Sequence, residues 1–270
     1  MITFVGSTYS YLWRHDLERA FEDIAAAGFT GVELLAAPPH VDLLDPAGSA
    51  ERVLAAVRRT GLAVHSVVPS GVDVNLASVE PSMRDWSVDY FGQAGRLAAE
   101  VGARWLIAHP GRRHPFRPPP YEQCVEWAVA GLERVVVAVE REAVGVLLEN
   151  TPTGVLDTAA ECVQTLRLLG SADVGVCYDV ANGHMVEEVA TAIRHVGADA
   201  SLVHLSDTTR ERWAHDPIGT GGIPFREVAS ALSGIRYDGH AVLETLHGDD
   251  ARAGFAADFA NLRGAGWDTP

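Results

Sequence analysis

The chain repeats one unit eight times: a short run of apolar residues followed by a segment whose apolar residues have helical spacing. Short apolar runs bounded by turn residues are typical of strands that are buried in a parallel sheet. The strands are predicted at residues 2–5, 31–35, 62–68, 105–109, 144–149, 174–179, 201–205 and 240–245.

The segments between these strands predict helices. Asp16 is the expected N-cap of the first helix, which runs from Leu17 and ends at Gly28. The other helices are predicted at residues 50–59, 83–101, 121–142, 158–169, 186–196 and 250–262, with a short one from residue 224.

Alternating strand and helix units favour a parallel sheet, and eight such units can close into a barrel. A length of 270 residues is ordinary for this architecture. The competing architecture, an open doubly wound sheet, would be supported by a Gly-x-Gly-x-x-Gly turn after a strand, and no predicted strand leads into one. The predicted fold is therefore an α/β fold, a (β/α)8 TIM barrel, in one domain over residues 1–270.

Composition narrows the classes of function. With 47% hydrophobic and 21% charged residues the chain can bury a large core, and its formal net charge of −15 disfavours a nucleic-acid partner. The three cysteines are widely separated within apolar patterns, which indicates core residues in a reducing compartment, the cytoplasm. We see no signal peptide and no 18-residue apolar run, so no membrane partner is expected.

Four successive strands end in side chains that bind metals: Glu149, Asp179, His204 and Glu244. Taken singly, a strand-end carboxylate or histidine is more often a helix cap or a structural partner. Active sites of barrels lie where the strands end, so all four side chains are expected on one rim. Three carboxylates there repel one another unless a cation lies between them. The set predicts one divalent metal ion, Mn²⁺, Mg²⁺, Co²⁺ or Zn²⁺.

The same rule puts Glu33, His65 and His109 on this rim. In these residues and the motifs around them, the chain resembles the xylose isomerase-like TIM barrel superfamily, in its sugar phosphate isomerase/epimerase branch. The resemblance extends over almost the whole chain. It is carried by Gly31-Val-Glu33, Ala108-His109-Pro-Gly111, Leu148-Glu149-Asn150, Tyr178-Asp179 with Gly183-His184, Val203-His204-Leu-Ser-Asp207, the stretch from His215 to Phe225, and Leu243-Glu244-Thr245.

The resemblance implies a metal-dependent isomerase or epimerase that acts through an enediolate on a small sugar or polyhydroxylated keto compound. Glu149 and Glu244 would bind the metal and also move protons, and Asp179 and His204 would complete the ligand set. The residues expected to contact the sugar-like substrate are His65, His109, Asn182, His184, Arg210 and His215. Whether chains associate into a homo-oligomer stays open.

The resemblance also leaves alternatives. One is a lyase of the same superfamily, such as a dehydratase of a keto-inositol or of dehydroshikimate, or an enzyme that cleaves oxidised glycosides. A second is a nuclease like the apurinic endonucleases, which bind three zinc ions. That second alternative is disfavoured, because Trp213 stands where those enzymes have an Asp, and Asn182 stands where relatives often have a His. A non-catalytic binding protein would leave Glu149 and Glu244 without a purpose.

Overall fold

A computed structural model describes residues 2–71 and 73–270, in which eight parallel strands close into a barrel. The barrel strands are β1 (Thr3–Ser7), β2 (Gly31–Ala36), β3 (Ala63–Pro69), β4 (Trp105–Ala108), β5 (Gly145–Glu149), β6 (Val174–Asp179), β7 (Ala200–Leu205) and β10 (His240–Leu243). Around the ring their order is β1, β10, β7, β6, β5, β4, β3, β2. The predicted (β/α)8 TIM barrel is confirmed.

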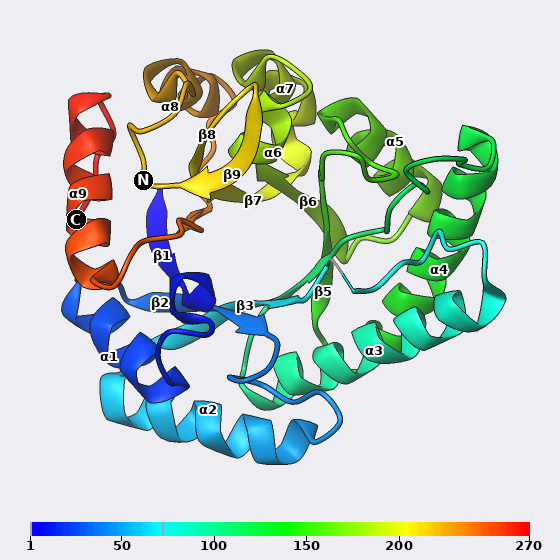
Figure 1. Cartoon of the computed structure of the whole chain (residues 1–270), viewed down its shortest axis with the longest axis horizontal. Coiled ribbons are helices and arrows are strands. Elements are labelled where there is room, and N and C mark those ends of the chain that lie inside the picture. The colour runs from blue at the N-terminus through cyan, green and yellow to red at the C-terminus, as the bar shows by residue number, and fades with distance from the viewer. Residues whose placement is uncertain (1, 72) are drawn as a thin grey trace.

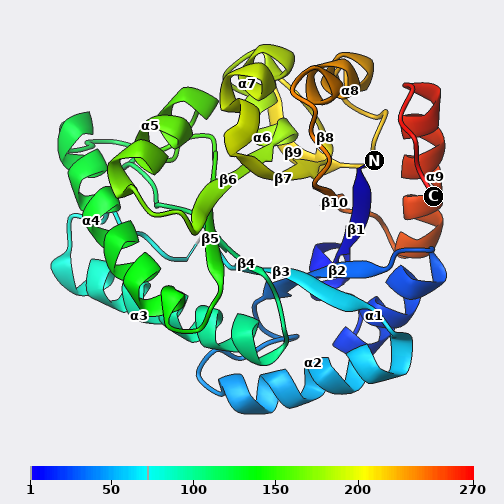
Figure 2. The same ribbon diagram turned by 180° about the vertical axis from the view of Figure 1, so that it is seen from behind.

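Helices surround the strands, as the two opposite views show (Figures 1 and 2). They are α1 (Leu17–Ala26), α2 (Pro46–Thr60), α3 (Pro81–Glu100), α4 (Tyr121–Glu140), α5 (Ala159–Leu169), α6 (Val180–His184), α7 (Val189–Val196), α8 (Phe225–Gly234) and α9 (Ala251–Gly264). Two short 3₁₀ segments, η1 (Thr8–Tyr11) and η2 (Gly197–Asp199), complete the helical elements of the described residues.

Local sequence explains where several helices begin and end. The Asp16 carboxylate accepts a hydrogen bond from the backbone N–H of Arg19, so Asp16 caps α1 as predicted. A capping box joins Thr158 and Glu161 at the start of α5. Gly61 ends α2 with φ of 76°, a left-handed conformation that costs glycine little.

Three predicted segments need correction. The second helix starts at Pro46 rather than at residue 50, because proline is well accommodated in a first helical turn. The helix expected at residues 186–196 is α7, which starts later, at Val189. A separate short helix that was not predicted, α6, directly follows β6, where Asp179 caps it. The loop expected after the seventh strand contains an antiparallel hairpin, β8 (Asp207–Thr209) and β9 (Arg212–Asp216).

Much of the barrel interior is apolar. One buried cluster comprises Val5, Leu35, Ala37, Val68, Ile107, Leu147, Cys177, Leu202 and Val242. A second and larger cluster fills the space between the strands and the helices. The three cysteines are unbonded and buried, as predicted. Among the described residues, no helix is both long and apolar enough to cross a membrane.

Candidate metal centre and active site

The four predicted ligands lie together at the carboxyl end of the barrel. Glu149 and Asp179 are the last residues of β5 and β6, and Glu244 directly follows β10. Asp179 pairs in register with His204, so neighbouring strands deliver their side chains at one level. One ligand atom from each of the four residues lies within 4.8 Å of the others. The geometry is that of a metal site built from four strand ends.

His204 lies at the centre of this group. Its Nδ1 atom is 3.2 Å from Glu149 Oε1, 3.2 Å from Glu244 Oε2 and 3.9 Å from Asp179 Oδ2. All four side chains are buried, with at most 6% of any residue exposed. Burying three carboxylates so close together is costly unless positive charge compensates them.

The donor set fits a divalent ion. Asp179 Oδ1 accepts a hydrogen bond of 2.7 Å from the backbone N–H of Asn182, which fixes the carboxylate, while Asp179 Oδ2 faces the group without a hydrogen-bond partner. His204 Nδ1 is likewise buried without a hydrogen-bond partner. Three carboxylates and one imidazole form a mixed oxygen and nitrogen set that Mn²⁺, Mg²⁺, Co²⁺ and Zn²⁺ accept.

The charged side chains of this group shift one another's pKa values. Burial raises the pKa of Asp179 to about 7, with the Glu149 and Glu244 charges acting in the same direction and His215 opposing them. Burial also raises the pKa of Glu149, but His109 and His204 outweigh it and hold that pKa below its ordinary value. Burial lowers the pKa of His204, but Cys177 and the carboxylates of Glu33, Glu244 and Glu149 raise it well above its ordinary value. Positive charge is therefore favoured at the centre of the group.

Two further predicted residues adjoin the carboxylates. His109 Nε2 is 2.7 Å from Glu149 Oε2, and the histidine ring packs so closely on Gly71 that a Cβ atom there would lie 2.6 Å from it. His215 Nδ1 is 3.4 Å from Glu244 Oε2 and 3.0 Å from the hydroxyl of Ser206. The structure thus brings His109 and His215 to the two glutamates, one to each.

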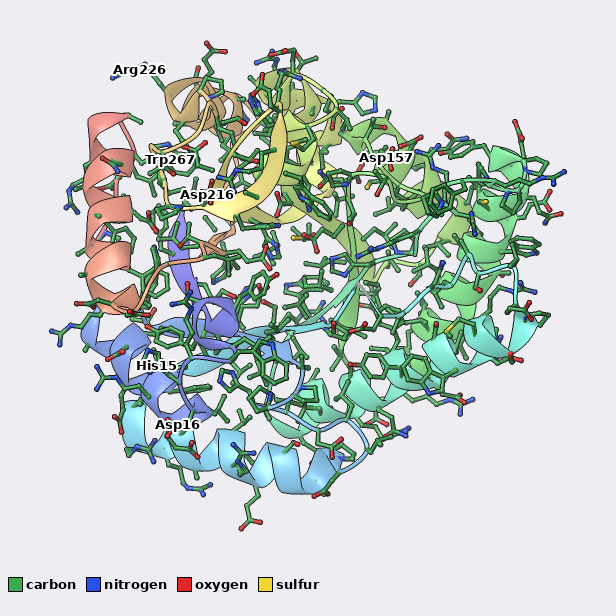
Figure 3. The ribbon with its side chains drawn as sticks, viewed as in Figure 1. His15, Asp16, Asp157, Asp216, Arg226 and Trp267 are labelled. Carbon is green, nitrogen blue, oxygen red and sulfur yellow. The ribbon has the colours of Figure 1, made fainter. Side chains whose placement is uncertain are left out.

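His215 reaches the group from the hairpin that the sequence analysis missed. It lies on β9, whose last residue, Asp216, is labelled in Figure 3, and the backbone oxygen of His215 accepts a hydrogen bond of 2.6 Å from the backbone N–H of Leu246, just after β10. The ring of Tyr9, from η1, meets the ring of His215 edge-on with their centroids 6.1 Å apart. Tyr9 therefore forms part of the wall of the site, a role that periodicity alone cannot indicate.

Both polar atoms of the Asn182 side chain already have hydrogen-bond partners within the protein. Its side-chain N–H donates to the backbone oxygen of Asn150 at 3.0 Å, and its side-chain oxygen accepts from Trp213 Nε1 at 2.7 Å. Asn182 and Trp213 are the two positions at which the sequence departs from the three-zinc endonucleases. The structure joins them by a hydrogen bond instead of leaving two metal ligands there.

His184 and Arg210 lie farther out. His184 ends α6 and is buried; burial and the nearby charge of Arg210 both lower its pKa. The guanidinium of Arg210 donates to Glu188 Oε1 at 2.5 Å and to the backbone oxygen of Glu187 at 3.3 Å. Arg210 is partly exposed, so this ion pair lies near the surface.

The expectation that His65 lies on the same rim is wrong. Its ring packs on the ring of His240 with their centroids 4.0 Å apart, and His240 is the first residue of β10. Four strand residues, about 13 Å, separate His240 from Glu244. His65 is the third residue of β3 (Ala63–Pro69), so it lies near the amino end of that strand and not at the rim. A bulge, at which Val32 pairs with Val64 but Glu33 pairs with Ser66, makes His65 an extra residue there.

Glu33 is the site residue whose role the sequence analysis missed. It is fully buried on β2, and its Oε2 atom lies 3.1 Å from His204 Nε2. The same oxygen accepts a hydrogen bond of 2.7 Å from the hydroxyl of Ser66. The only signal in the sequence was a carboxylate inside an otherwise apolar strand.

Known proteins agree with this architecture. The sequence profile of the family described as "Xylose isomerase-like TIM barrel" matches residues 21–264. Fructoselysine 3-epimerase of Escherichia coli O157:H7 is 23% identical over 242 residues, which cover 86% of each chain. D-psicose 3-epimerase of Agrobacterium fabrum is 24% identical over 253 residues, which cover 88% of this chain and 83% of the relative.

Among solved structures, the crystal structure of a D-tagatose 3-epimerase-like protein superposes with a TM-score of 0.86. The match covers 98% of both chains at 22% identity. The family profile extends over most of the barrel and includes every strand that carries one of the four candidate ligands. The chain therefore belongs to the xylose isomerase-like TIM barrel family.

Proposed function

We propose that this protein is a metal-dependent epimerase or isomerase of a small sugar or polyhydroxylated keto compound. The observation that carries the proposal is the placement of two buried glutamates, Glu149 and Glu244, each 3.2 Å from His204 Nδ1. They come from β5 and β10, three positions apart around the barrel, so they approach the centre from different sides. A pair of bases on two sides of one carbon is what inversion of a stereocentre requires.

The names of the relatives support the choice of reaction. Two curated proteins and a solved structure with high coverage are named as 3-epimerases or as similar to one, of fructoselysine, psicose and tagatose. In a 2-ketose, carbon 3 lies next to the carbonyl group, so its proton is acidic enough for a carboxylate to remove when the developing charge is stabilised. We therefore favour inversion at that carbon over the other reactions of the family.

Glu149, Asp179, His204 and Glu244 would hold the metal ion. Bound there, a divalent ion would polarise the substrate carbonyl and stabilise the negative charge that develops on its oxygen. The site identifies the ion only as one that accepts carboxylate and imidazole ligands, namely Mn²⁺, Mg²⁺, Co²⁺ or Zn²⁺.

The protein side chains would move the proton. One glutamate, ionised, would remove the proton from the carbon next to the carbonyl, which leaves an enediolate. The other, in its acid form, would donate its own proton to the opposite face. His109 contacts Glu149, and His215 contacts Glu244. Each glutamate therefore has an imidazole beside it, and a positive charge on that imidazole would favour the ionised carboxylate. His184 and Arg210 lie outside this inner group, where they would contact the more distant hydroxyl groups of a sugar.

The family alternatives have less support. A lyase would form the same enediolate and then lose a leaving group, but no contact in the described site favours this outcome. A three-zinc nuclease is disfavoured because Asn182 and Trp213 hydrogen-bond to each other where two further ligands would be needed.

Incubation with ketoses in D₂O tests the proposal. Protein reconstituted with Mn²⁺, Co²⁺, Mg²⁺ or Zn²⁺ is incubated with a panel of ketopentoses and ketohexoses, and products are resolved by chromatography and NMR. We expect one ketose to yield its 3-epimer with deuterium on carbon 3. An unsaturated product would indicate a lyase, and turnover without solvent deuterium would contradict proton transfer through the two glutamates.

A further inference from the structure

We propose that Glu33 is a positioning residue, which orients His204 and fixes the tautomer that presents Nδ1 to the metal. The inference rests on the metal site of the proposed function, and it concerns a residue to which neither the family resemblance nor the ligand geometry assigns a role. It is carried by one contact across the barrel, between Glu33 on β2 and His204 on β7.

The contact joins strands that are not neighbours. Going around the ring from β2, the path to β7 passes β1 and β10. Glu33 therefore reaches into the interior and meets His204 from the side opposite to the ligand carboxylates. His204 Nε2 lies 3.1 Å from Glu33 Oε2, while Nδ1 faces Glu149 and Glu244. The imidazole therefore has one carboxylate on its Nε2 side and three on its Nδ1 side.

This arrangement decides which nitrogen carries the proton. An ionised carboxylate can only accept hydrogen bonds, so the Nε2 atom that meets Glu33 must carry the hydrogen. In the neutral imidazole the other nitrogen, Nδ1, then has a free lone pair, which is what a metal ligand needs. Histidine ligands in proteins commonly donate their second N–H to a carboxylate in this way, which fixes the ring and raises its basicity.

Ser66 holds Glu33 in place. Its hydroxyl donates to the same Oε2 atom at 2.7 Å, and the bulge in β3 sets Ser66 opposite Glu33 in the strand pairing. In a regular register continuing from Val32 and Val64, His65 and not Ser66 would stand opposite Glu33. Glu33 and Ser66 are both fully buried, so the contact has no competition from bulk water.

Metal titration of matched variants tests the proposal. Chelator-treated protein is titrated with Mn²⁺ by calorimetry, with stability measured in parallel by urea unfolding. Glu33→Leu removes both charge and acceptor, whereas Glu33→Gln keeps an acceptor oxygen. We expect Glu33→Leu to weaken Mn²⁺ binding by about 10- to 100-fold, Glu33→Gln to weaken it less, and Ser66→Ala to weaken it least.

Glu161→Gln serves as the control, because Glu161 is a hydrogen-bonded carboxylate of α5 that does not contact His204. It should lower stability and leave Mn²⁺ affinity unchanged. In the Zn²⁺-loaded wild type, NMR should show a His204 Nε2–H resonance that is shifted downfield by its carboxylate partner and moves upfield in Glu33→Gln.

The outcomes separate this inference from the proposed function. Folded Glu33→Leu that binds Mn²⁺ as tightly as the wild type would overturn the role of Glu33 and leave the proposed function intact. A His204 proton on Nδ1 in the Zn²⁺-loaded wild type would overturn it as well, and that result needs no variant to fold. Wild-type protein that binds Mn²⁺ through His204 yet epimerises no sugar would contradict the proposed function and leave the role of Glu33 standing.

Discussion

Glu149 and Glu244 have two tasks each in the proposed reaction, binding a metal and moving a proton. Replacing either by Gln keeps its shape but removes its basicity. We expect each single variant to lose turnover by ~10²-fold or more if general acid–base catalysis is its main task. Steady-state kinetics with the identified ketose, together with the metal content of each variant, separates the two tasks. Glu126→Gln on the exposed face of α4 is the control, and wild-type turnover in Glu149→Gln or Glu244→Gln would refute the assignment.

Arg210 is the residue whose predicted substrate contact is most directly testable. In the structure its guanidinium pairs with Glu188 near the surface, and pairs of that kind contribute under about 1 kcal/mol to stability. Arg210→Ala should therefore raise KM or lower kcat with little change in melting temperature. Glu188→Ala breaks the same ion pair but leaves the arginine, so it should retain activity. Equal losses of activity in both variants would show that the ion pair, and not substrate contact, is what matters.

His65 should make the protein sensitive to acid. Burial, with a further contribution from His240, lowers its pKa to about 4, so between about pH 6.5 and 4 the unfolded chain binds a proton that the folded chain does not. Stability should consequently fall as the pH falls through this window, by ~3 kcal/mol from this residue. Urea unfolding at several pH values, with chelator present, should show a shallower dependence for His65→Phe. Parallel curves for the two proteins would contradict this account.

At the scale of elements, Asn182 forms one link between the hairpin β8–β9 and the barrel. The Asn182 side chain hydrogen-bonds both to Trp213 on β9 and to the backbone oxygen of Asn150, which follows β5. Asn182→Ala leaves a buried carbonyl group and an indole N–H without partners, and should cost ~1–3 kcal/mol of stability. Trp213→Phe removes only the partly exposed donor and should cost less. If Asn182→Ala keeps full stability and raises KM, Asn182 contacts substrate as the sequence analysis expected.

The sequence predicted most elements because each barrel strand is an apolar run that precedes an amphipathic helix. It also predicted that Glu149, Asp179, His204 and Glu244 come together, since a carboxylate or histidine at the end of a buried strand stands out. It misplaced His65, because β3 continues to Pro69 and His65 lies near the amino end of the strand, whereas the rim rule applies only to side chains at the carboxyl end. The role of Glu33 was missed for another reason: its partner His204 is 171 residues away in the chain.

At the scale of the whole molecule, the proposed ligands come from four strands, β5, β6, β7 and β10, which are consecutive around half of the barrel. A metal ion bound by all four would connect that half through one centre. Unfolding of the barrel would separate the ligands, so the ion would bind the folded chain and not the unfolded one. Metal binding should therefore raise the free energy of unfolding of the whole barrel, in addition to its effect on activity.

The corresponding prediction is a metal-dependent melting temperature. An ion present at 100 times its Kd adds about 2.7 kcal/mol to stability. For a domain of this size that corresponds to a rise in Tm of roughly 5–10 °C over protein in chelator. Asp179→Asn is the matched variant, because asparagine can still cap α6 through its side-chain oxygen while the ligand charge is lost. It should fold in chelator as the wild type does and gain much less on addition of Mn²⁺. If Mn²⁺, Co²⁺, Mg²⁺ and Zn²⁺ all leave the wild-type Tm unchanged, the four strand ends do not form a metal site. An ion that binds only the folded chain must raise the free energy of unfolding, and with it the Tm.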